Sequence, residues 1–172
     1  VQNKANADRV KEIEFALQQL KKPGKESVVW RRILQLIDPG TFLSINSLYN
    51  PENNPEGTVG IVTGLAKVHG KCVCVIASDP DVLKGAWLPG QPQKILRMQR
   101  LAELLRTPIV WLLECSGLDL GRQDRVYTGH ESGGKIFFNN ARLASKGIPV
   151  VEGIATSVKT SVKTPIEPDQ VA

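Results

Sequence analysis

The chain has 172 residues, of which 41% are hydrophobic and 23% are charged, and its formal net charge is +5. These values are ordinary for a water-soluble globular protein, and the length suits a single domain. Lys and Arg are scattered and aromatic residues make up only 5%, so the composition argues against a nucleic-acid partner. No apolar run approaches the roughly 18 residues of a membrane span, and we expect no signal peptide.

The first forty residues are expected to form a helical segment, residues 1–40. Residues 8–22 carry apolar side chains at helical spacing, with an acidic residue near the start and lysines at the end. Ser27 is suited to cap a second, shorter helix, which ends at the turn sequence Asp38-Pro39-Gly40. Both helices predict packing and say little about function.

The next segment predicts strands. Residues 42–48 alternate loosely enough for an edge strand, and a polar loop follows from 50 to 57. Residues 58–65 and 71–78 are two strand-like runs with a short separation, which indicates a β-hairpin. His69 falls in its turn, where we expect an exposed side chain.

Helices and strands alternate in the second half of the chain. A helix is predicted over 91–106, a strand over 109–114, and a long loop over 119–132. A further helix reaches Lys146, and a strand over 150–154 follows it. The side chains expected to face inward from that helix are Phe137, Phe138, Ala141 and Ala144. The order of elements predicts an α/β fold with parallel strands joined by helical crossovers.

In the strand predicted over 109–114, the unbroken apolar run from Ile109 to Leu113 is typical of a strand covered on both faces. The strand is followed by Cys115-Ser116-Gly117, where small residues let a backbone approach a ligand closely. Ligands of open α/β folds bind just outside the carboxyl ends of such strands. We therefore expect the N–H groups of Gly117 and Leu118 to face a substrate.

The three cysteines do not predict a metal site. Cys72 and Cys74 lack the second pair that zinc requires, so we expect three reduced, buried thiols. An alternative makes Cys115 or Ser116 a nucleophile with His130 as its base, although no acidic third member can be distinguished. A packed thiol at Cys115 and a turn at Ser116 are the simpler expectations.

Several segments resemble the α subunit of glutaconyl-CoA decarboxylase, a biotin-dependent carboxyltransferase of the crotonase superfamily. The segments are Asn46-Ser-Leu-Tyr-Asn-Pro-Glu-Asn-Asn54, Gly85-Ala-Trp-Leu-Pro-Gly-Gln91, Cys115-Ser-Gly-Leu118, and Phe137-Phe138 followed by Leu143 and Gly147-Ile-Pro-Val150. The resemblance runs from about residue 33 to 154. It implies a crotonase-like ββα superhelix, here one truncated domain with its core over 41–154 and an extended tail over 155–172.

The resemblance also implies a chemistry. A γ-carboxylated enoyl-CoA loses its carboxyl group to biotin, and backbone N–H donors stabilise the charge that develops on the thioester oxygen. By position, the first donor is the N–H of Leu118, with Ser116 and Gly117 shaping the turn. The product from glutaconyl-CoA would be crotonyl-CoA.

Two further groups of residues are expected to contact the substrate. By resemblance, Gly85, Ala86 and Trp87 line the substrate channel. Arg97 shares a helix with Lys94 and Arg100, from which the three could reach CoA phosphates; the alternative is a solvated helix face.

Biotin is expected on a separate carrier chain, since Met98 is the single methionine and no biotin-attachment motif occurs. The family implies sodium-pumping membrane subunits as partners, a homo-oligomer, and a cytoplasmic location at the periphery of the inner membrane. No metal is implied.

One departure leaves the activity open. The family has a glycine-rich loop after the strand at 150–154, and this loop gives a second oxyanion donor. This chain has Ala155-Thr-Ser-Val-Lys there instead. The chain is therefore expected to be a fragment of the enzyme or a shortened relative. The alternative function is a non-catalytic crotonase-like module that binds CoA or a partner.

Overall fold

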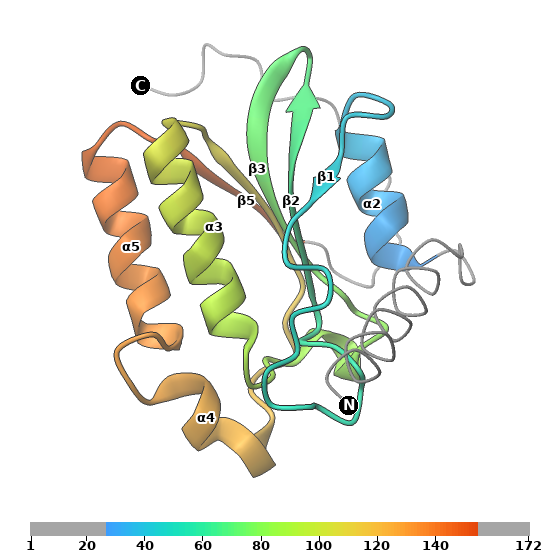
Figure 1. Ribbon diagram of the computed structural model, residues 1–172, viewed down its shortest axis with the longest axis vertical. Coiled ribbons are helices and arrows are strands. Elements are labelled where there is room, and N and C mark those ends of the chain that lie inside the picture. The colour runs from blue at the N-terminus through green and yellow to red at the C-terminus, as the bar shows by residue number, and fades with distance from the viewer. Residues whose placement is uncertain (1–26, 155–172) are drawn as a thin grey trace, which may run out of the picture.

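The computed structural model describes residues 27–154, which form a five-stranded sheet with helices on both faces (Figure 1). In spatial order the strands are β1 (Leu43–Ser44), β2 (Ile61–Val68), β3 (Lys71–Ser78), β4 (Ile109–Leu113) and β5 (Val150–Ile154). The first three are antiparallel neighbours, and β3, β4 and β5 are parallel. The predicted α/β class and the hairpin are confirmed.

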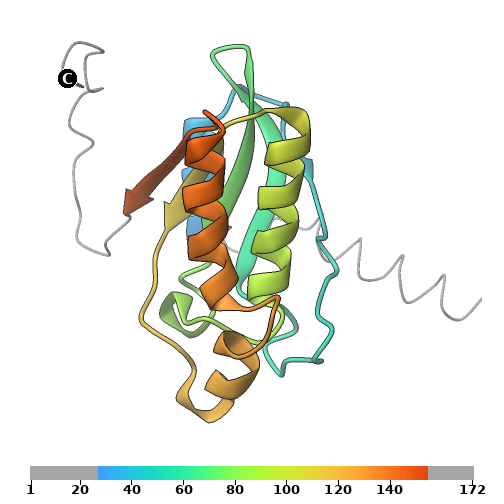
Figure 2. The same cartoon turned by 90° about the vertical axis from the view of Figure 1, so that its left-hand side faces the viewer.

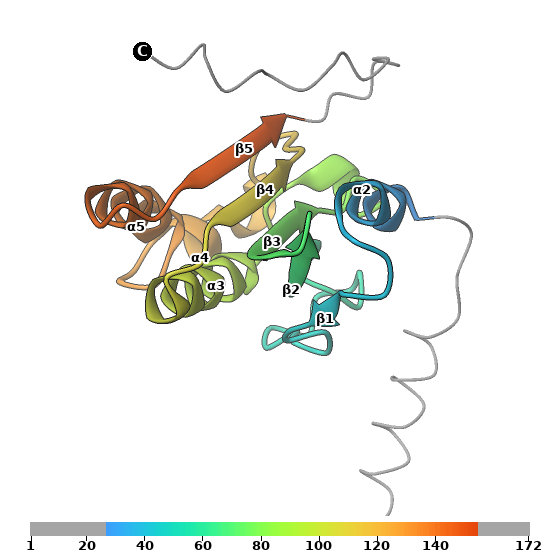
Figure 3. The same ribbon diagram turned by 90° about the horizontal axis from the view of Figure 1, so that it is seen from above.

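The sheet separates the core into two layers, and helices cover both of its faces. The helices are α2 (Val28–Leu36), α3 (Gln91–Leu105), α4 (Gln123–Tyr127) and α5 (Gly133–Ser145), with short 3-10 turns η1 (Leu83–Gly85) and η2 (Leu120–Arg122). Helix α2 covers one face of the sheet, and α3 and α5 lie side by side on the other (Figures 2 and 3). Each layer has its own cluster of buried apolar side chains.

Strand β4 contributes to both layers, as its unbroken apolar sequence predicts. Ile109 and Trp111 are buried in the cluster under α3 and α5. Val110 and Leu112 pack against the cluster under α2. Because β4 lies between two parallel strands, its carboxyl end is held at a fixed place on the sheet edge.

The turn between β2 and β3 is stabilised by Asp38, a residue outside the hairpin. His69 and Gly70 both have positive φ angles, of 49° and 76°, as a two-residue hairpin turn requires. The Asp38 carboxylate accepts from both of their N–H groups, at 3.0 and 2.7 Å. The exposed position predicted for His69 is confirmed. Strand β2 begins at Ile61, three residues later than expected, after Gly60 with its φ of +69°.

Three predictions about local structure are wrong. The edge strand expected over 42–48 is only the two residues of β1. The loop expected over 119–132 contains η2 and α4. Ser27 stands at the N-cap position of α2, but its hydroxyl makes no capping hydrogen bond.

The inward face of α5 also differs from its prediction. Phe137 and Phe138 are 60% and 57% exposed, and the alanines predicted to face inward are exposed too. The buried side chains are instead Ile136, Asn139 and Leu143. Asn139 is polar and therefore hid the true stripe, but its Nδ2 donates to Gln99 Oε1 on α3 at 3.0 Å. A hydrogen bond between two side-chain amides thus replaces an apolar contact between the two helices, while the buried Asn139 Oδ1 has no partner among the described residues.

Two expected segments, the helix over 8–22 and the tail over 155–172, lie outside the described residues. None of the helices described between 27 and 154 combines the length and apolarity of a membrane span.

Candidate functional site

Two loops meet at the carboxyl edge of the sheet, one after β3 and one after β4. Trp87 donates its N–H to the carbonyl of Gly117 at 3.0 Å, and Asp119 donates its N–H to the carbonyl of Trp87 at 3.2 Å. These bonds make a short parallel bridge between Trp87 and Leu118. The structure therefore brings together the two segments, 85–87 and 116–118, that were singled out from the sequence.

The bridge sets the direction of the Leu118 N–H. That group shares a planar trans peptide with the Gly117 carbonyl, so the two point in opposite directions. Since the carbonyl points at Trp87, the Leu118 N–H points away from it. It has no hydrogen-bond partner among residues 27–154. The neighbouring amide differs, because the Gly117 N–H donates to the Cys115 sulfur at 3.3 Å.

The residues predicted to line a substrate channel pack against the turn formed by residues 115–118, on the side of the loop after β3. Gly85, Ala86 and Trp87 are all buried. Gly85 lies against the backbone carbonyl of Glu114, and the Trp87 ring is part of the apolar core. Their place beside the turn fits the expectation, while contact of these side chains with a ligand stays a prediction.

The strand end is also tied to α2. Arg32 forms an ion pair with the Glu114 carboxylate, and both side chains are largely buried. At the start of α2 the Val28 N–H donates to Asp81 in the loop after β3, at 3.4 Å. The helix on the far face of the sheet therefore holds both loops that form the turn.

The nucleophile alternative gains no support from the geometry. The Ser116 hydroxyl donates to the carbonyl of Leu83 at 3.1 Å. No hydrogen bond within the described part of the chain joins His130 to Ser116 or Cys115. The cysteine prediction is wrong in part, since Cys74 is buried but Cys72 and Cys115 are exposed. No three metal-binding side chains come together within residues 27–154.

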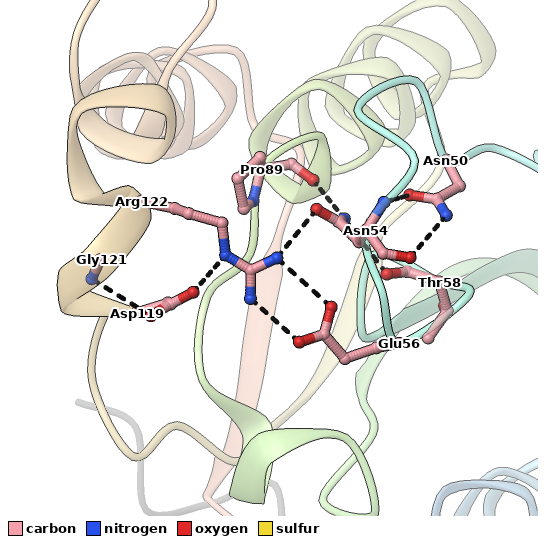
Figure 4. A network of polar contacts seen from close by, with 8 residues as sticks. All are labelled: Asn50, Asn54, Glu56, Thr58, Pro89, Asp119, Gly121 and Arg122. Atoms are coloured by element: carbon pink, nitrogen blue, oxygen red, sulfur yellow. Dashed lines mark hydrogen bonds and ion pairs between the residues drawn. The ribbon is translucent and has the colours of Figure 1, made fainter.

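A polar network centred on Arg122 lies beside the turn (Figure 4). Its Nε binds Asp119, and its terminal nitrogens donate to Glu56 at 2.9 and 3.3 Å and to Asn54 at 3.3 Å. The buried Asn54 donates onward to the carbonyls of Pro89, at 2.9 Å, and Thr58, at 3.2 Å. The loop over 50–58 is therefore fastened to both loops of the turn.

The charges of this network reinforce one another. The hydrogen bonds from Arg122 lower the pKa of Glu56 and that of Asp119 below their usual values. In return, the two carboxylates, Glu56 first, raise the pKa of Arg122. All three groups are ionised at neutral pH.

The three basic residues of α3 do not form a single face. Lys94 is buried, and its ammonium donates to the carbonyl of Ile61 at 2.7 Å, so the alternative of a solvated helix face is wrong for this residue. Burial lowers the pKa of Lys94 to about 8. Arg100 pairs with Glu131 at the surface, and Arg97 is exposed. Binding of CoA phosphates by Arg97 stays a prediction.

The sequence assigns no role to the network residues, because the loop over 50–57 is polar and its first part, as far as Asn54, contributes only to the family resemblance. One signal was present: the loop carries Glu52 and Glu56, and the later loop carries Arg122 and Arg125. In the structure Arg122 forms an ion pair with Glu56, and Arg125 forms one with Glu52. Complementary charge between two loops does not identify its own partner, so the match was visible only after folding.

Comparison with known proteins assigns the chain to a family. A family model described as "Carboxyl transferase domain" matches residues 21–159. The chain belongs to this family. It is 40% identical over 163 residues to the glutaconyl-CoA decarboxylase subunit alpha of Acidaminococcus fermentans. It is also 35% identical over 123 residues to the methylcrotonoyl-CoA carboxylase beta chain, mitochondrial, of Arabidopsis thaliana.

The fold agrees with this assignment. The crystal structure of the P. aeruginosa geranyl-CoA carboxylase beta subunit matches with a TM-score of 0.65 and 29% identity over 86% of the chain. The predicted crotonase-like fold and the predicted resemblance are both confirmed. The matched regions cover only 28% of the Acidaminococcus relative, 21% of the Arabidopsis relative and 28% of the crystallised subunit.

Proposed function

We propose that the chain forms part of the carboxyltransferase subunit of a biotin-dependent, sodium-pumping acyl-CoA decarboxylase. The substrate is glutaconyl-CoA, the product is crotonyl-CoA, and the carboxyl group is transferred to biotin. The observation that carries the proposal is the Leu118 N–H, which has no partner among residues 27–154 and points away from the Trp87 bridge.

The chemistry explains why a fixed amide matters. The bond between the carboxyl carbon and the γ-carbon breaks, and its electron pair spreads through the enoyl group onto the thioester oxygen. The carboxyl carbon bonds to the biotin ureido nitrogen, and the proton displaced there ends on the γ-carbon. An amide already directed at the thioester oxygen stabilises the developing charge without reorganisation, by about 3–4 kcal/mol.

Each predicted residue has a place in this proposal. The Leu118 N–H donates to the thioester oxygen, while Ser116 and Gly117 shape the turn. The segment from Gly85 to Trp87 lines the acyl channel from behind, and Arg97 binds a CoA phosphate. The subunit acts in the cytoplasm at the periphery of the inner membrane, as a homo-oligomer with membrane subunits. Biotin on a separate carrier chain is the carboxyl acceptor and is treated as the second substrate.

A second candidate is a module that binds CoA or a partner without turnover. It is favoured by the turn itself, where the Leu118 N–H is open but the Gly117 N–H is used by Cys115. The position of the family's second donor, after the strand at 150–154, lies outside the described residues.

One experiment separates the candidates. The chain is incubated with glutaconyl-CoA and biotin, and crotonyl-CoA is followed by liquid chromatography, with a control lacking biotin. Biotin-dependent crotonyl-CoA supports the decarboxylase. Calorimetric binding of CoA without product supports the binding module, and labelling of Ser116 by a fluorophosphonate would support a hydrolase instead.

A further inference from the structure

Arg122 belongs to a closed ring of hydrogen-bonded residues that surrounds the Leu118 amide. One arm runs from the guanidinium to Asp119, the residue that follows Leu118. The other arm runs through Asn54 to the carbonyl of Pro89, two residues beyond Trp87. The ring is completed by the backbone pairing of Trp87 with the turn. Figure 4 shows the guanidinium lying between the three loops.

Asp119 is held at four points, one of which is its carbonyl, which accepts from the Arg122 backbone N–H at 3.0 Å. Its N–H donates to the Trp87 carbonyl, and its carboxylate accepts from Arg122 Nε and from the Gly121 N–H, the latter at 3.3 Å. The peptide on the other side of Leu118 is held by the bond from Trp87 to Gly117. The Leu118 N–H is therefore fixed from both sides, and Arg122 supplies the side-chain contact that ties Asp119 to Glu56 in the loop over 50–58.

Every nitrogen of the guanidinium donates at least one hydrogen bond. Glu56 accepts from both terminal nitrogens, Asn54 accepts from one of them, and Asp119 accepts from Nε. Two carboxylates already neutralise its charge, so it is poorly suited to bind an anionic substrate. Its hydrogen bonds instead hold the side chains of Asp119, Glu56 and Asn54 in fixed orientations.

We propose that Arg122 is a positioning residue, which orients the Leu118 N–H toward the thioester oxygen of a bound acyl-CoA by locking Asp119 to the loop over 50–58. This inference rests on the proposed function, because it assigns a task to the amide that the function uses. It predicts that loss of Arg122 frees the turn while the sheet and helices keep their structure.

The chain contains a matched control. Arg125 pairs with Glu52 at 3.3 Å and so joins the same two segments. Its side chain is 58% exposed, whereas that of Arg122 is 23% exposed, and none of its hydrogen bonds within the described residues reaches Asp119 or Asn54. An effect seen with Arg122 but not with Arg125 is therefore not the general result of removing one ion pair between these segments.

The first measurement is amide hydrogen exchange by NMR, which needs no ligand. Arg122→Gln should speed exchange of the Asp119 N–H roughly tenfold, and Arg125→Gln should change it less than about twofold. Amides of α5 should keep their rates in both variants. An unchanged rate for Asp119 in Arg122→Gln overturns the inference. If that variant does not fold, Glu56→Gln provides the same test by removing one carboxylate from the guanidinium.

The second measurement is the Leu118 N–H resonance during titration with crotonyl-CoA or free CoA. In the unmodified chain, crotonyl-CoA should shift this resonance and free CoA should not. Arg122→Gln should lose the thioester-specific shift but keep its affinity for CoA within about twofold, and Arg122→Lys should restore only part of the shift. A shift retained in Arg122→Gln overturns the inference. Absence of the shift in the unmodified chain overturns the proposed function instead, and the exchange rates still decide the role of Arg122 in the turn.

Discussion

Gly85 packs directly against the backbone carbonyl of Glu114, the residue that follows β4. Its φ of +76° lies in the left-handed region, and a Cβ at this position would collide with the Glu114 oxygen. The loop after β3 can therefore rest on the end of β4 only because residue 85 has no side chain. The contact sets how closely the loop that carries Trp87 approaches the turn that carries Leu118.

Replacing Gly85 by alanine should destabilise the protein by about 2–4 kcal/mol, from the left-handed backbone and the collision together. Gly70 has the same φ of +76° and open space around it, so Gly70→Ala isolates the backbone contribution, about 1–2 kcal/mol. Urea unfolding of both variants gives the difference. Equal losses of unfolding free energy in the two variants would show that the collision with the Glu114 oxygen does not destabilise Gly85→Ala.

Leu118→Pro removes the open N–H that the proposed chemistry requires. The rate of crotonyl-CoA formation should fall about 10²–10³-fold, the usual loss for one oxyanion donor. Leu118→Ala keeps the N–H and should retain most of the rate. Equal damage from the two substitutions would place the effect in the packing of the side chain.

The cysteines allow a direct probe of the turn. Iodoacetamide should alkylate the exposed Cys72 and Cys115 in the native protein but not Cys74, which is buried and whose pKa burial raises to about 11. Crotonyl-CoA should slow labelling of Cys115, two residues from Gly117, and leave Cys72 as the internal control. Mass spectrometry of the peptides measures each rate. Equal protection at Cys72 and Cys115 would contradict a ligand at the turn.

Much of the fold could be predicted because its signals are local. The apolar run of β4, the short separation in the hairpin at His69 and the turn at Asp38 are each contained within a few residues. The face of α5 could not be predicted in the same way. Its buried Asn139 has a partner, Gln99, forty positions away, and no local pattern contains that pairing.

The candidate site divides along the same line. Small residues after a buried strand predicted the turn at Gly117 and Leu118, because the rule concerns one strand end. The bond from Asn54 to Pro89, the ion pair of Arg122 with Glu56 and the burial of Lys94 depend on which loops and strands the fold brings together. The side chains of Asn54, Lys94 and Arg122 are visibly polar in the sequence, but their partners lie between 33 and 66 positions away.

The ion pair of Arg32 with Glu114 should contribute to stability, because its side chains are only 24% and 16% exposed. Arg32→Met leaves the carboxylate without this partner and should cost about 1–2 kcal/mol in the free energy of unfolding. Arg31→Met, at an exposed position on the same helix, should cost less than about 0.5 kcal/mol. A double-mutant cycle with Glu114→Gln measures the coupling, and a coupling near zero would contradict the prediction.

Lys94 should make stability rise with pH in the alkaline range. Burial lowers its pKa from 10.5 to about 8, so below pH 8 the folded protein holds a buried charge at a cost. Between pH 8 and 10.5 the folded state has released this proton while the unfolded state still binds it, and stability therefore increases, by at most about 3 kcal/mol. Cys74 acts in the opposite direction above pH 9, because its pKa is raised in the folded state.

The contribution of Lys94 is therefore obtained from a comparison with Lys94→Met, which keeps an unbranched side chain without the charge. Urea unfolding from pH 7 to 10 should show stability rising less with pH in Lys94→Met than in the unmodified chain, and Lys71→Met, at an exposed position, should keep the original dependence. Identical pH dependence in the unmodified chain and Lys94→Met would mean that the ammonium is solvated after all.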